Sequence, residues 1–145
     1  MSENGGGLIR GTLRWIQIKH NKEAMWDDEG EFRFRSKITT SGESHEIEFP
    51  EQGYWSISDH PRRNKVDKID KVLFEGDAGD SLVVELFGVE LDQLTANDHL
   101  EDYSREFTGP ASSWIGRHQP TDEGTGDPEN MVDWRVCYDI EEAEA

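Results

Sequence analysis

Three acidic residues have a spacing that suits the binding of a cation. Glu90 and Asp92 are two positions apart at the end of an apolar run, and Asp98 follows after a short polar segment. Residues two apart in an extended chain point to the same side, so Glu90 and Asp92 direct their carboxylates into one space. A turn brings Asp98 toward them. Carboxylates held together repel one another, and calcium, a hard ion that takes several oxygen ligands from loops, suits this loop.

The element that positions these carboxylates is a strand over residues 81–91, the most strand-like run in the chain. Leu82, Val84 and Leu86 fall on one face of this run, while Val83 and Phe87 fall on the other. Alternation of this kind is typical of a β-strand that packs against a core. The acidic loop therefore leaves the end of a well-defined strand.

Other short runs alternate in the same way. Phe32 and Phe34 lie on one face of the segment 31–38, and Arg33 and Arg35 lie on the other. We expect further strands over 8–20, 45–49, 54–57, 72–76, 103–107 and 131–140, and a short one within 109–118. The best helical candidate, 64–73, is short, and 118–130 is a long loop by composition. About seven or eight strands separated by turns predict an all-β chain, an antiparallel sandwich or barrel.

Length and composition fit one domain. The chain has 145 residues, 33% of them hydrophobic, and a mean hydropathy of −0.84. Those values allow disorder, but the five Trp, six Phe and three Tyr lie within short apolar runs and supply a core. We expect a flexible N-terminus over 1–7, one β-sandwich domain over 8–141 and an acidic tail over 142–145.

The net charge restricts the partners. The chain carries 32 Asp and Glu against 15 Lys and Arg, which gives −17. This field repels nucleic acid and attracts divalent cations or basic proteins. It is also consistent with a salt-adapted host. Cys137 is the single cysteine, so no disulfide forms within the chain. No signal peptide or membrane-spanning run is visible, so the default expectation is a cytoplasmic protein.

The late acidic loop resembles the C2 family of calcium-dependent membrane-binding domains. These domains carry a loop of the form D-x-D-x5-D after an apolar strand, often ending N-D-x-[IL]-G. This chain reads E-L-D-Q-L-T-A-N-D-H-L-E and matches at Glu90, Asp92, Asp98, Asn97 and Leu100. Glu replaces the first Asp and the closing Gly. The resemblance implies a C2-like sandwich that binds calcium and docks on a membrane surface or a protein partner.

C2 domains also take calcium ligands from an early loop, which corresponds here to residues 24–34. Asp27, Asp28 and Glu31 supply carboxylates in that segment. No pair of them has the family's usual separation, so the assignment within this loop stays open. Trp26 precedes these residues. It either contacts a membrane interface or a sugar, or covers one end of the core.

Catalytic motifs are missing from the sequence. It has no nucleophile elbow, no P-loop, no dinucleotide fingerprint and no zinc spacing between its histidines and Cys137. We therefore expect a protein that is not an enzyme. Three functions stay open: a calcium-binding module that docks through two acidic loops, a metal-free interaction subunit with an acidic surface for a basic partner, and a carbohydrate-binding sandwich.

Overall fold

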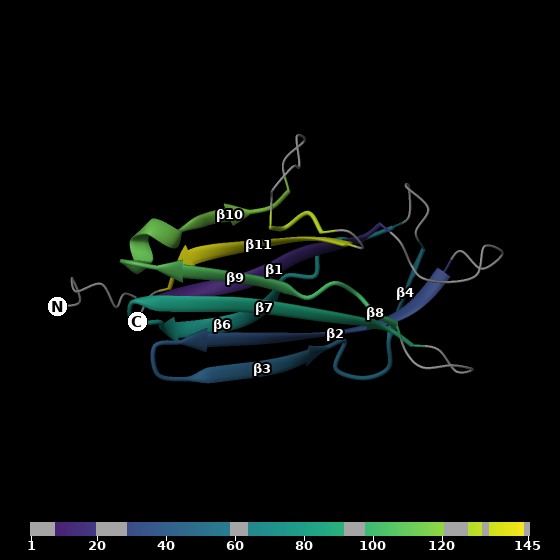
Figure 1. Ribbon diagram of the computed structural model, residues 1–145, viewed down its shortest axis with the longest axis horizontal. Helices are drawn as coiled ribbons and strands as arrows, with labels where there is room; N and C mark the ends of the chain where they lie inside the picture. The colour runs from purple at the N-terminus through teal and green to yellow at the C-terminus, as the bar shows by residue number, and fades with distance from the viewer. Residues whose placement is uncertain are drawn as a thin grey trace.

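The computed structural model describes residues 8–19, 29–58, 64–91, 98–120, 128–131 and 134–143, which form two antiparallel sheets (Figure 1). Sheet A contains β1 (Leu8–Ile18), β5 (Lys65–Val66), β6 (Lys71–Asp77), β10 (Gly116–His118) and β11 (Trp134–Glu142). Sheet B contains β2 (Glu29–Thr40), β3 (Ser44–Phe49), β4 (Trp55–Ser58), β7 (Ser81–Glu90), β8 (Asp98–His99) and β9 (Tyr103–Thr108). The prediction of an all-β sandwich is confirmed.

The order of the strands gives each sheet two edges. Sheet A runs β10-β11-β1, and β5 and β6 both pair with the far side of β1. Sheet B runs from β3 and β4, which pair with one side of β2, through β7 to β8 and β9. The sandwich therefore has two long seams. One lies between β9 and β10, and the other lies between β3 with β4 and β5 with β6.

The strands β2 and β7 form the centre of sheet B and show the alternation that the sequence predicts. Residues of β7 are alternately buried and partly exposed along its whole length, and Leu82 and Leu86 face the core. Phe32 and Phe34 are buried on β2. The core is completed from sheet A, where the fully buried Trp134 stacks on Phe34 with 5.5 Å between the ring centroids.

Two segments have a secondary structure that differs from the one expected from the sequence. The helical candidate 64–73 is not a helix: it contains β5, an irregular connection over 67–70 and the start of β6, with positive φ at Lys68 (56°) and Asp70 (47°) that a right-handed helix does not accept. Within 109–118 a short 3-10 helix, η1 (Ala111–Trp114), precedes β10. In the portion that the structure describes, no helix has the length and apolar character needed to cross a membrane.

Candidate functional site

The late acidic loop begins and ends on the same strand pair. β7 ends at Glu90, β8 begins at Asp98, and the backbones of these two residues are paired in register. The amide of Leu100 donates a 2.9 Å hydrogen bond to the carbonyl oxygen of Gly88, which holds the returning chain against β7. The fold thus places the backbone of Asp98 beside Glu90. Asp92 lies outside the described residues, as does the side chain of Asp98.

Glu90 is placed in the interior. Its side chain is 0% exposed, and it shares the inner face of sheet B with its pairing partner Phe32. Gly30 leaves room for it, because a Cβ atom at that position would lie 3.1 Å from Cγ of Glu90 and 2.7 Å from the Phe32 ring. A buried carboxylate is costly unless a proton or a positive charge neutralises it. The end of the core at the last residue of β7 therefore contains a buried carboxyl group.

Glu31 is on the opposite face of sheet B from Glu90. It neighbours the inward-facing Phe32, and successive strand residues point to opposite faces. Its carbonyl oxygen accepts a 2.7 Å hydrogen bond from the amide of Leu91. Its side chain is hydrogen-bonded to Tyr54, which raises the pKa of that phenol. The structure therefore does not bring the side chains of Glu31 and Glu90 together.

The remaining predicted site residues, Trp26, Asp27 and Asp28, lie outside the described residues. Among the residues that the structure does describe, no group of three or more His, Cys, Asp or Glu side chains is placed to hold a metal ion. A role for the two acidic loops in binding calcium stays a prediction.

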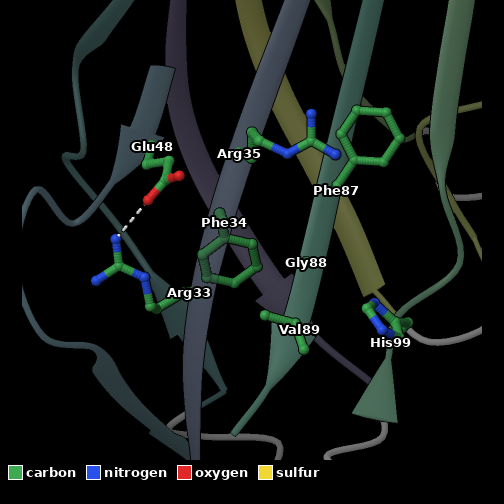
Figure 2. A pocket seen from close by; sticks show the side chains of 8 residues that line it. All are labelled: Arg33, Phe34, Arg35, Glu48, Phe87, Gly88, Val89 and His99. Carbon is green, nitrogen blue, oxygen red and sulfur yellow. Dashed lines mark hydrogen bonds and ion pairs between the residues drawn. The ribbon is translucent and has the colours of Figure 1, made fainter. Parts of the chain in front are cut away.

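A shallow groove lies on the outer face of sheet B next to β8 (Figure 2). Its volume is about 190 Å³. The residues that line it come from β2, β3, β7 and β8, and they are Arg33, Phe34, Arg35, Glu48, Phe87, Gly88, Val89 and His99. The groove is thus adjacent to the strand to which the late loop returns.

The groove combines guanidinium groups with an apolar strip. The Arg35 guanidinium lies 4.4 Å from the centroid of the Phe87 ring, the distance of a cation–π contact (Figure 2). Arg33 donates a 2.7 Å hydrogen bond to Glu48, and Arg35 donates a 2.8 Å bond to Glu46. These ion pairs are partly exposed to solvent. In a chain of net charge −17, this outer face offers positive and apolar groups together.

Part of this groove could be predicted from the sequence. Alternation with Phe32 and Phe34 places Arg33 and Arg35 on the outer face, as expected. Which residues of β7 lie beside these two arginines depends on the pairing register of β2 and β7. In that register Arg35 lies directly opposite Phe87. Sequence periodicity assigns a residue to a face but does not say which residue of the next strand lies beside it.

No protein-family model matches the sequence, and no curated protein matches it. Among solved structures, the fold is similar to that of a C2 domain, the domain designated A, of plant Extended Synaptotagmin 1, with 9% sequence identity and a TM-score of 0.51. The similarity covers 99% of this chain and 100% of that chain. The sandwich is therefore C2-like, which confirms the fold that the late loop implied. At this identity the likeness establishes the fold alone.

Proposed function

We propose that this chain is a non-catalytic C2-like binding module, which docks through the end of the sandwich where β2, β7 and β8 meet. In this proposal, calcium bound between the acidic loops controls docking. The observation that supports it best is the complete burial of Glu90 at the end of β7, beside the returning backbone of Asp98. A carboxylate at the base of this loop is the kind of oxygen ligand that calcium takes, and calcium accepts the geometry of a loop.

The proposed ligands are Glu90, Asp92 and Asp98, with Asp27 or Asp28 from the early loop. Glu31 is the weakest of the proposed ligands, because its side chain is on the outer face of sheet B. Bound calcium makes the local potential less negative. The groove of Arg33, Arg35 and Phe87 beside β8 then meets an anionic membrane surface, or a protein partner, with less repulsion.

Thermal unfolding in calcium, magnesium or chelator tests the metal site. If calcium is present at about a hundred times its dissociation constant, we expect the melting temperature to rise by roughly 5–10 °C. Magnesium has a smaller effect because it prefers a tighter octahedral cage. The variant Glu90→Gln loses the calcium-dependent shift, while Glu106→Gln, an exposed residue of β9, keeps it. An equal shift in all three proteins, or none at millimolar calcium, contradicts the proposal.

Vesicle sedimentation tests the docking step. We expect the protein to sediment with vesicles of phosphatidylcholine and phosphatidylserine in calcium, and to stay in solution with phosphatidylcholine alone or with chelator. The double variant Arg33→Gln with Arg35→Gln weakens sedimentation if the groove faces the membrane. A calcium-dependent melting shift without sedimentation indicates a protein partner in place of the membrane.

A metal-free interaction module is the second candidate function. The observation that favours it is the orientation of Glu31 and Glu90 on opposite faces of sheet B, so these two carboxylates do not share a site. This candidate predicts melting curves that are the same in calcium and in chelator, together with a stable complex that forms in chelator.

A further inference from the structure

The two long seams of the sandwich differ in how they are closed. Between β9 and β10, the carboxylate of Glu129 accepts hydrogen bonds from Tyr103 (2.6 Å) and from Arg105 (2.8 Å). The Phe107 ring packs there against His118, with 5.0 Å between the centroids. Tyr103 and Glu129 are buried, so polar and aromatic contacts exclude solvent from the core on this side of the molecule. We call it the closed seam.

The opposite side, between β3 with β4 and β5 with β6, leaves apolar side chains partly exposed. In the described part of the chain, five hydrophobic residues pack against the core without being buried, and all five lie on this side: Ile47, Trp55, Val66, Ile69 and Phe74. Val72 of β6 is 44% exposed beside them. Two grooves, of about 500 Å³ and 360 Å³, follow this side. We call it the open seam.

The strand β3 offers a regular edge along the open seam (bottom of Figure 1). It pairs with β2 from Ser44 to Phe49 in an unbroken register, and no other described strand pairs with it. β6 is less regular, because its pairing with β1 shifts at Leu73. Bulges weaken an edge as a template for a further strand, so β3 is the better of the two.

We infer that the open seam is the docking site for an extended segment of a partner protein, which adds to β3 as a strand and alternates apolar with basic residues. The two faces of β3 define this pattern. Ile47 lies on the inner row, next to the groove that Val72 and Phe74 line, so inward side chains of an added strand would bury apolar surface. Glu46 and Glu48 lie on the exposed outer row and are paired with Arg35 and Arg33, but their carboxylates stay at least half exposed, so Lys or Arg on a neighbouring strand can share them.

The net charge of the chain favours a different protein over a second copy of this chain as the partner that binds the open seam. Two copies bring together net charges of −17 each. Pairing of β3 with β3 would also set the outer glutamates of one copy beside those of the other, which is destabilising. A basic partner is attracted both by the net negative charge of the chain and by the outer glutamates of β3. Docking of a strand on the β3 edge, which pairs with residues 34–39 of β2, needs no metal.

A seven-residue peptide of alternating lysine and valine, capped at both ends, is a direct probe. We expect it to perturb backbone amide resonances of β3 and β6 and to slow hydrogen exchange in β3, in chelator as well as in calcium. A peptide of the same composition with its lysines and valines in separate blocks controls for simple charge attraction. If both peptides perturb the protein equally, or if the perturbed residues lie outside the open seam, the inference is overturned.

Matched variants give the second test. Val72→Glu places a carboxylate where the probe would bury apolar groups, and we expect the affinity of the alternating peptide to fall by about tenfold. Ile115→Glu is the control, because Ile115 is 40% exposed and lies between η1 and β10, away from the open seam. Equal weakening by both variants contradicts the inference. Self-association in sedimentation that Val72→Glu abolishes assigns the seam to a second copy and overturns it as well.

Discussion

The phenol of Tyr103 donates a 2.6 Å hydrogen bond to Oε2 of Glu129 in the interior of the closed seam. The hydroxyl groups of Tyr103 and Tyr138 lie 2.7 Å apart in the same cluster. Burial raises the pKa of both phenols, so both stay protonated at neutral pH and keep a hydrogen to donate. Arg105 donates to the same carboxylate oxygen and supplies the opposite charge. The cluster therefore joins β9, β11 and the segment that contains Glu129.

Removal of the Tyr103 hydroxyl will destabilise the sandwich. The variant Tyr103→Phe takes away one donor to a buried carboxylate, and we expect the free energy of unfolding to fall by about 1–3 kcal/mol in urea denaturation. Tyr54→Phe is the matched control, because Tyr54 is 47% exposed and water replaces the contacts of its hydroxyl. An equal free energy of unfolding for Tyr103→Phe and the unmodified protein would show that the hydroxyl of Tyr103 does not stabilise the fold.

Gly88 of β7 has no room for a side chain. A Cβ atom there would lie 2.7 Å from Cδ1 of Leu100 and 2.9 Å from the Phe34 ring. We expect Gly88→Ala to lower the free energy of unfolding by about 1–3 kcal/mol, because the core must shift to accept it. Gly11→Ala is the control, since no atom lies within 4 Å of the corresponding Cβ. Thermal melts of the two variants that coincide would contradict this account.

Asp139 gives the protein part of its stability at moderate pH. Hydrogen bonds from Arg117 and then from Arg14 lower the pKa of its carboxyl in the folded state. The contribution is fully present above the unfolded pKa of about 3.9 and is lost as the pH falls from there through the lower folded pKa. Asp139→Asn should reduce stability at pH 7 by about 1 kcal/mol, since the site is partly solvated, and should weaken the acid dependence below pH 4. Denaturation midpoints between pH 2 and pH 7 that run parallel in the two proteins would refute this.

Cys137 will react slowly with thiol reagents. Its side chain is fully buried, and burial raises the pKa of the thiol to about 11. Only the thiolate attacks iodoacetamide, so at pH 8 we expect labelling to take hours in the folded protein and to be rapid in denaturant. Mass spectrometry after timed quenching measures the difference. Complete labelling of the folded protein within a minute would show that this part of sheet A opens readily.

The strands could be predicted because their residues alternate between core and solvent. Phe32 and Arg33 on β2 lie on the expected faces, and so do Leu82 and Val83 on β7. The helical candidate 64–73 misleads because Val66 and Ile69 have helical spacing, although they pack against the core from β5 and from the irregular connection that follows it. Short periodic runs do not separate the two possibilities, and tertiary packing decides between them.

Contacts between distant segments could not be predicted from the sequence. Glu129 lies in a stretch that its composition assigns to a loop, yet it is 3% exposed and holds Tyr103 and Arg105. Glu90 was expected at the end of a strand, with its carboxylate directed toward Asp92, and nothing in the sequence indicated that its side chain is enclosed in the interior. In an acidic chain the buried carboxylates look like the many exposed ones, because burial depends on residues that only the fold brings near.

The difference between the two seams has a consequence for motion. The polar cluster of the closed seam ties β9 to β11, while in the described part of the chain β3 meets β6 through the packing of His45 on Phe74. We therefore expect any separation of the two sheets to start at the open side, since buried hydrogen bonds join the closed one. Opening of this kind costs less free energy than complete unfolding. Such an opening exposes the core along β3.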